Sequence, residues 1–83
     1  MNMIVAEVYL PASGKSYEIR VPAAMNSLLA AHLTADGLGN LSEGTYRSSR
    51  SSVFAWQDSG KVLEMEKSME EANVRNGSKL LLV

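Results

Sequence analysis

Apolar and polar residues alternate along two neighbouring segments near the start of the chain. The first segment is Met3–Leu10 and the second is Tyr17–Val21. A period of two residues, carried by β-branched and aromatic side chains, is typical of strands. Pro11 ends the first segment, and Gly14 suits the left-handed position of a bulged hairpin turn. The pattern therefore predicts an antiparallel hairpin.

The spacing of apolar residues becomes helical after this hairpin. Pro22 stops the second segment and suits the first turn of a helix. The residues that follow are rich in Ala, Leu and Met, which are good helix formers. Apolar side chains recur along one helical face: Met25, Leu28, Leu29 and Leu33, with Ala24, Ala31 and Ala35 beside them. We expect a mostly buried helix over Ala23–Ala35, which ends at the cap and loop residues Gly37 and Gly39.

Shorter elements are predicted in the second half of the chain. The serine-rich residues 40–52 lack a clear period and are expected to form a surface loop. Aromatic and β-branched residues predict a strand over residues 52–57, and Val62–Met65 is expected to return antiparallel to it. Ser68 and Glu71 match a capping box, which predicts about one helical turn.

The final segment, Lys79–Val83, contains an unbroken apolar run that follows the turn signal Asn76-Gly77. Such a run is typical of a central strand that is covered on both faces. A central final strand can pair parallel to the first strand, with a right-handed crossover through the helix. The sequence thus predicts one α+β domain over residues 1–83. It is a β-grasp, a mixed sheet of order 2-1-5-3-4 with one helix packed across it.

This layout resembles ubiquitin over nearly the whole chain, by pattern rather than by identity. The segments "YLP", Tyr17–Pro22 and Val74–Leu82 also resemble short motifs of the YukD/EsaB-type proteins. These are ubiquitin-like components of the type VII (WXG-protein) secretion system of Gram-positive bacteria. The resemblance implies a cytoplasmic accessory protein rather than an enzyme. Its implied partners are proteins, among the membrane or ATPase components of that system.

Charge and composition narrow the class of partner. The chain has 83 residues, a formal net charge of −1 and no cysteine. Nucleic-acid binding would need a clear basic excess, so nucleic acid is not expected as a partner. The missing cysteine excludes disulfides and cysteine chemistry. No apolar run approaches the ~20 residues that span a bilayer. The start of the chain has the pattern of a strand rather than of a signal peptide, so we expect a cytoplasmic protein.

Candidate catalytic chemistry is sparse. His32 is the only histidine, and it has no cysteine to act with in nucleophilic catalysis. The glutamate pairs between residues 64 and 71 have no histidine beside them and are expected to be solvated charges. The glycines of "GLGN" follow a helix, whereas a phosphate-binding glycine loop leads into one. We therefore expect no catalytic residue, no cofactor and no metal site.

A candidate protein interface lies around the second hairpin. Arg47 and Arg50 flank the serines of "YRSSRSS", and Phe54 and Trp56 share one face of the strand that follows. If the opposite face of this strand is in the core, the two aromatic rings form an exposed patch, which is a common interface anchor. If the rings face the core, the patch disappears. The pattern leaves both arrangements open.

The expected function is that of a non-catalytic protein-binding module, monomeric by default. Conjugated ubiquitin-like proteins and sulfur carriers need a flexible C-terminal Gly-Gly, because the activated carboxylate enters a pocket too narrow for side chains. Leu81, Leu82 and Val83 occupy that end here, which argues against both activities. The alternatives are a sulfur carrier or protein modifier with a truncated tail, and a small regulatory β-grasp subunit of a multicomponent enzyme.

Overall fold

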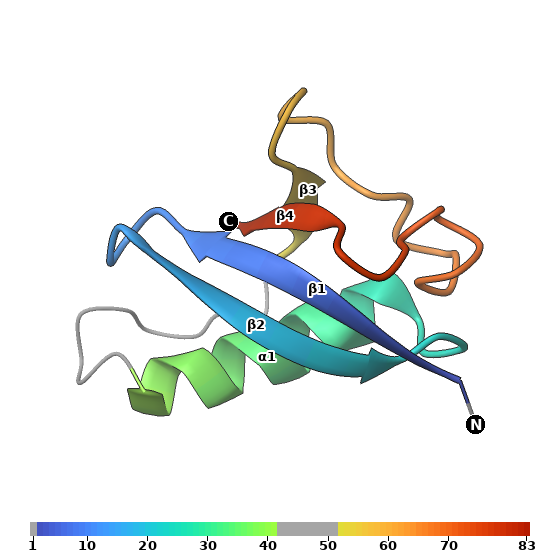
Figure 1. The fold of residues 1–83 in the computed structure, drawn as a ribbon, viewed down its shortest axis with the longest axis horizontal. Helices are drawn as coiled ribbons and strands as arrows, with labels where there is room; N and C mark the ends of the chain where they lie inside the picture. The colour runs from blue at the N-terminus through green and yellow to red at the C-terminus, as the bar shows by residue number, and fades with distance from the viewer. Residues whose placement is uncertain (1, 42–51) are drawn as a thin grey trace.

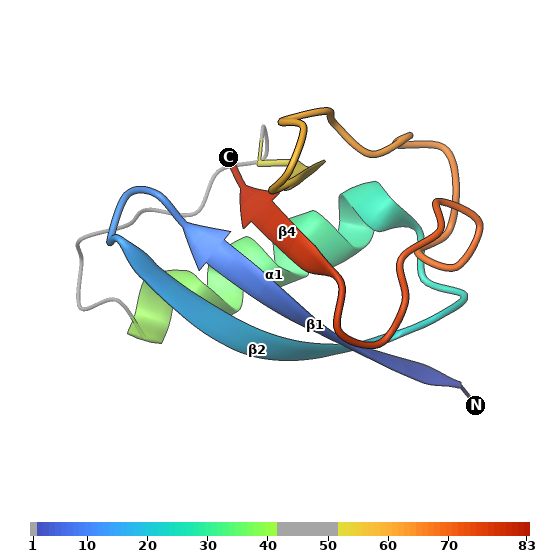
Figure 2. The same ribbon diagram turned by 45° about the horizontal axis from the view of Figure 1, so that its top comes forward.

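A mixed sheet with one helix across it makes up the fold (Figure 1). The computed structural model describes residues 2–41 and 52–83. The elements in chain order are β1 (Met3–Leu10), β2 (Lys15–Pro22), α1 (Ser27–Leu41), β3 (Phe54–Trp56) and β4 (Lys79–Leu82). The four described strands have the order β2-β1-β4-β3. Figure 2 shows β2, β1 and β4 side by side, with α1 behind them.

β1 and β2 form the predicted antiparallel hairpin. Both strands are eight residues long and pair over their full length. In the turn, the amides of Ser13 and Gly14 donate hydrogen bonds to the carbonyl of Leu10 at 3.1 and 2.9 Å. Gly14 has a φ of +69°, in the left-handed region that glycine adopts without steric cost. The role expected for this glycine is therefore confirmed.

The final strand lies in the middle of the sheet, as predicted. β4 pairs parallel to β1 and antiparallel to β3. Leu80 and Leu82 are buried, but Leu81 is half-buried and Lys79 is exposed. The expectation that this strand is covered on both faces is therefore wrong, because α1 covers only one face of the sheet.

The predicted strand Val62–Met65 is not formed. A single bridge joins Val62 to β3. Beyond this bridge the chain leaves the sheet, because the carbonyl of Glu64 accepts a hydrogen bond of 2.8 Å from the hydroxyl of Ser27 at the start of α1. The predicted order 2-1-5-3-4 is therefore corrected at its outermost strand, while the other four strands take their predicted places.

The helix begins later than predicted, at Ser27 rather than Ala23. The side-chain oxygen of Asn26 accepts the amides of Leu28 and Leu29 at 3.0 and 3.1 Å. Asn26 is therefore the N-cap. The residues before it form a turn instead, which the amide of Met25 closes on the carbonyl of residue 22 at 3.1 Å.

The helix also ends later than predicted, because it continues through Gly37 and Gly39 to Leu41. A glycine inside a helix costs about 1 kcal/mol relative to alanine. Leu38, between the two glycines, is 4% exposed and packs into the core. Full burial of a leucine side chain contributes about 1.5–3 kcal/mol, which is enough to offset the cost of one glycine and to carry the helix onward.

Alanines, together with Leu38, form the face of α1 that lies in the core. Ala30, Ala31 and Ala35 are fully buried, whereas Leu29 and Leu33 are 49% and 51% exposed. The expected apolar face is therefore confirmed at Ala31 and Ala35 but wrong at Leu29 and Leu33. Alanines let the helix approach the sheet closely, and the strands supply most of the larger core side chains: Ile4, Val8, Leu10, Val21, Phe54, Leu80 and Leu82.

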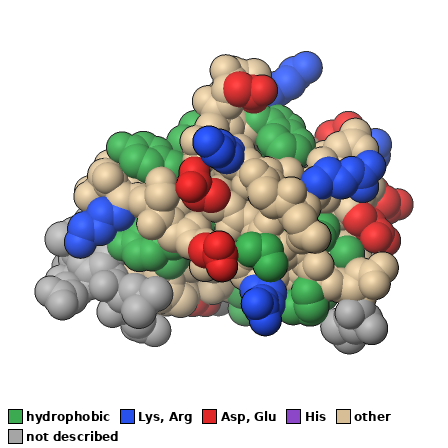
Figure 3. Space-filling model, in the orientation of Figure 1, with side chains coloured by type: hydrophobic (Ala, Val, Ile, Leu, Met, Phe, Trp, Pro, Cys, Tyr) green, Lys and Arg blue, Asp and Glu red, His purple; other side chains and the backbone are tan. Residues whose placement is uncertain are grey.

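The face of the sheet opposite α1 is mixed in charge. Figure 3 shows acidic and basic side chains interspersed on the side where the strands lie in front of the helix. β1 and β2 contribute the exposed residues Glu7, Glu18 and Arg20 to the sheet face opposite the core. A surface with both signs of charge has no strong field for nucleic acid.

Candidate protein-binding surface

The four residues predicted for the interface are not seen to form an exposed patch. Phe54 is 2% exposed and lies in the core, and Trp56 is half-buried against the core. The aromatic rings thus take the core-facing arrangement. This removes Phe54 from any contact with a partner. Arg47 and Arg50 lie outside the described residues.

Trp56 borders a hollow of about 460 Å³, which is also lined by Gln57, Asp58 and Lys79. The amide side chain of Gln57 is fixed there, because its Nε2 donates to the carbonyl of Leu80 at 3.0 Å. Asp58 and Lys79 are exposed and carry opposite charges. An aromatic ring beside fixed polar groups is suited to contact with a protein.

A more apolar groove of about 420 Å³ lies between β2 and α1. One wall comes from β2, through Tyr17, Ile19 and Val21, and the other includes Leu33 and Leu38 of α1. Apolar groups that stay exposed beside an open strand are typical of surfaces that bind proteins. This groove is therefore the stronger candidate surface within the described residues.

The groove was not predicted, because Leu29 and Leu33 have the same helical spacing as core residues. The signal that could have revealed it is the spacing of the alanines. Ala31 and Ala35 are four residues apart and so share a helical face, and their small size favours close contact with the sheet. The leucines, also four apart, then occupy a neighbouring face that faces outward.

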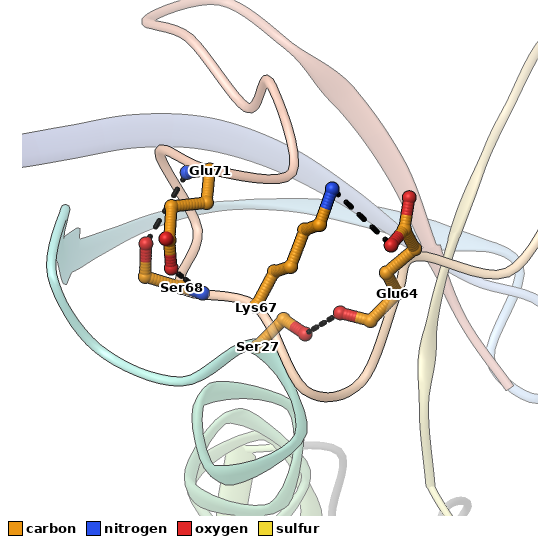
Figure 4. Close-up of polar contacts among 5 residues, drawn as sticks. All are labelled: Ser27, Glu64, Lys67, Ser68 and Glu71. Atoms are coloured by element: carbon orange, nitrogen blue, oxygen red, sulfur yellow. Dashed lines mark hydrogen bonds and ion pairs between the residues drawn. The ribbon is translucent and has the colours of Figure 1, made fainter.

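A network of polar contacts fixes residues 64–71 against the start of α1 (Figure 4). Ser68 and Glu71 form the predicted capping box. The Ser68 amide donates to Glu71 Oε1 at 2.9 Å, and the Glu71 amide donates to Ser68 Oγ at 3.2 Å. The hydrogen bond from the Ser68 backbone lowers the pKa of Glu71, because it favours the charged carboxylate. This network has a structural role.

One ion pair accompanies this network. Lys67 Nζ lies 3.3 Å from Glu64 Oε2, and both side chains are exposed (Figure 4). Exposed pairs of this kind contribute about 0–1 kcal/mol. The pair therefore adds little to stability.

No described group of side chains is arranged for catalysis by a metal or a histidine. His32 is half-buried, and its Nε2 atom is buried without a hydrogen-bond partner. Across residues 2–41 and 52–83, no cluster of three His, Cys, Asp or Glu residues could hold a metal ion. In the same residues, α1 is neither long nor apolar enough to cross a membrane.

The fold can be compared with known proteins. No protein-family model matches the chain, and no curated protein matches it significantly. Among solved structures, it is similar to the ubiquitin-like domain of the Mycobacterium tuberculosis type VII secretion system protein ECCD1. The TM-score is 0.77 at 20% identity, over 100% of this chain and 99% of that one. The chain has a ubiquitin-like fold.

Other ubiquitin-like structures agree. A structure of the MycP5-free ESX-5 inner membrane complex matches with a TM-score of 0.79 at 16% identity, over 100% of this chain and 21% of that one. The UBL domain of Plasmodium falciparum Dsk2 matches with a TM-score of 0.70 at 17% identity, over 99% and 97% of the two chains. Identities this low show the fold alone, so the likeness to type VII secretion components is a likeness of fold.

Proposed function

We propose that this chain is a non-catalytic, ubiquitin-like protein-binding module that serves as a cytoplasmic accessory component of a type VII-like secretion apparatus. The observation that carries the proposal is the match to the ECCD1 domain, which covers essentially all of both chains. The motifs in Tyr17–Pro22 and Val74–Leu82, which resemble those of the YukD/EsaB-type proteins, support it independently of the fold.

A binding role fits the surface chemistry of the described residues. Leu33 presents an apolar side chain beside the groove, and it is 51% exposed. The carboxylate of Glu71 is engaged in the capping box, so it serves the fold. Trp56, with Arg47 and Arg50, remains a proposed second contact region.

The partners we propose are membrane or ATPase components of the secretion apparatus. Support comes from the ESX-5 match, because that structure is an inner membrane complex in which a ubiquitin-like segment forms part of a much longer chain. This chain, which has the same fold, docks onto such components through the groove between β2 and α1.

Gene deletion tests the function. In a source strain with an active type VII system, deletion should strongly reduce export of WXG-type substrates, measured by immunoblotting of the medium and the cells. Restoring the wild-type gene should restore export. Unchanged export in the deletion strain would contradict the proposal.

A matched pair of leucine variants tests the surface. Leu33→Asp places a charge in the groove, and Leu29→Asp places one on the same helix but outside it. Both side chains are about half exposed, so neither change should unfold the protein. Leu33→Asp should fail to restore export, and Leu29→Asp should succeed. Equal results for the two variants would exclude the groove as the binding surface.

A further inference from the structure

The outward edge of β2 has no partner strand among the described residues. The amide of Ala23 donates to the carbonyl of Asn2 at 2.8 Å, so these two residues are a hydrogen-bonded pair in the register of the hairpin. Such pairs recur at every second residue of an antiparallel ladder. Tyr17, Ile19 and Val21 therefore direct their backbone groups toward β1.

The intervening residues of β2 direct their backbone groups outward: Ser16, Glu18, Arg20 and Pro22. A proline fits this position, because its missing amide leaves no bond to β1 unmade. The other side of β1 agrees with this assignment. The amide of Glu7 donates to the carbonyl of Ser78 at 2.9 Å, and the carbonyl of Val5 accepts from Gly77 at 2.8 Å. The backbone N–H and C=O groups of odd-numbered residues of β1 thus point toward β4, and those of even-numbered residues point toward β2.

Glu18 and Arg20 are exposed charges on this edge, and neither has an ion pair within the described residues. Glu18 lies directly opposite Glu7 in the hairpin register. Like charges at such positions are destabilising. A positive charge brought beside Glu18 from outside the molecule would offset this repulsion.

We propose that a second copy of this chain pairs with the outward edge of β2, antiparallel and two-fold symmetric about Ile19. In this register each Glu18 lies opposite Arg20 of the second copy. Centring the pair on Glu18 or on Arg20 instead would place identical charges opposite each other. Of these registers, only the one centred on Ile19 gains two opposite-charge pairs, which makes the edge complementary to itself, as a two-fold interface requires.

The backbone groups support the same register. Glu18 and Arg20 both direct their N–H and C=O groups outward, so each Glu18–Arg20 pair can exchange two hydrogen bonds. At each end of the interface, the amide of Ser16 can donate to the carbonyl of Pro22. The proline has no amide to return, so the carbonyl of Ser16 remains bonded to water at the end of the ladder. The result is one continuous sheet across both copies.

The apolar side of β2 also matches itself in this register. Ile19 meets Ile19 of the second copy, and Tyr17 meets Val21, on the face of the sheet that α1 covers. These side chains form one wall of the groove of about 420 Å³. The added strand extends this wall beyond β2 and removes the apolar edge of β2 from water, which favours association.

The opposing expectation is a monomer, because charged residues and proline on an edge strand can also block pairing. The monomer and the dimer depend on the charges in different ways. Any charged side chains on the edge can prevent strand pairing, whereas the proposed dimer needs opposite signs of charge at positions 18 and 20.

Sedimentation velocity of the full chain over a range of concentrations tests the proposal. The wild type should reach a mass of twice 9.0 kDa as its concentration rises. Glu18→Arg and Arg20→Glu should each give a monomer, because each places like charges opposite each other. An equimolar mixture of these two variants should form a dimer, since the positive edge of one then faces the negative edge of the other. The double variant should dimerise like the wild type.

Charge reversals elsewhere provide the control. Lys61→Glu and Glu66→Arg change exposed residues outside β2 and should leave the dimer intact, with circular dichroism confirming the fold of every variant. A wild type that is monomeric at every concentration overturns the proposal. A dimer that survives both single reversals in β2, or a mixture of the two variants that stays monomeric, overturns it as well. The measurement uses purified protein, so its outcome is independent of the export assay.

Discussion

The two edges of the sheet differ in how much of their backbone the chain covers itself. At the β3 edge, the returning chain adds hydrogen bonds. The amide of Trp56 donates to the carbonyl of Lys61 at 2.9 Å, and the amide of Leu63 donates to the carbonyl of Phe54 at 3.0 Å. β3 is three residues long and β2 is eight. At β2, no described strand pairs with the outward side.

In the account proposed above, the closed edge serves stability and the open edge serves association. The short edge carries an aromatic residue of the core and is closed by the residues that follow it. The long edge carries one exposed charge of each sign, Glu18 and Arg20, and borders an apolar groove. Proteins usually protect such edges, because an open strand recruits other chains. In the proposed dimer, the charges of β2 disfavour self-pairing centred on Glu18 or on Arg20 and favour self-pairing centred on Ile19.

The largest expected effect is at the closed edge. Phe54→Ala should cost about 3–5 kcal/mol of unfolding free energy, because it removes a fully buried aromatic ring. Chemical denaturation measures this, and Phe54→Leu provides a milder variant if the alanine variant does not fold. In the groove beside the open edge, Leu33→Ala in α1 should change the free energy of unfolding by less than about 0.5 kcal/mol. Equal losses of unfolding free energy in Phe54→Ala and Leu33→Ala would contradict the difference between the two edges.

A smaller loss of unfolding free energy is expected at Asn26, which binds the segment that leaves the sheet after β3. Asn26 caps α1, and its Nδ2 donates to the carbonyl of Met65 at 2.8 Å. Asn26→Ala should therefore cost about 1–2 kcal/mol of unfolding free energy. Asn26→Asp keeps the capping oxygen and loses only the donor, so it should cost less. An alanine variant as stable as the wild type would show that this contact does not hold the segment.

The smallest effect is expected at the turn that leads back to β4. The Ser68 backbone lowers the pKa of Glu71 in the folded protein relative to its ordinary value of 4.5. The carboxylate therefore contributes stability above pH 4.5, and this contribution is lost as the pH falls through the lowered folded pKa. The stability of wild type relative to Glu71→Gln should thus decrease in acid. Glu70→Gln, at an exposed neighbour, is the control, and an equal pH dependence for both variants would contradict the assignment.

The regular elements could be predicted because their signals are local. The alternation in β1 and β2 and the leucines of β4 specify strands without reference to distant residues. The predicted strand Val62–Met65 failed because its path depends on Ser27 and Asn26, which are 37 and 39 residues away from their acceptors in sequence. A local sequence pattern does not predict a hydrogen bond between a side chain and a backbone carbonyl so far away in the sequence.

The candidate surface was harder to predict than the fold. β3 is apolar on both faces, so alternation could not decide whether Phe54 and Trp56 face the core. The exposed leucines of α1 were not separated from core residues, because helical spacing gives a face but not the distance to the sheet. That distance is set by the buried alanines, such as Ala31 and Ala35.

Amide hydrogen exchange, followed by NMR in dilute and concentrated protein, tests the contrast between the edges most directly. The amides of Trp56 and Leu63, at the closed edge, should be protected at both concentrations, as should that of Ile19 within the hairpin. The amides of Glu18 and Arg20 should exchange rapidly in dilute protein and slow down as concentration rises. Rapid exchange at Trp56 and Leu63, or exchange at Glu18 and Arg20 that does not change with concentration, would contradict the account.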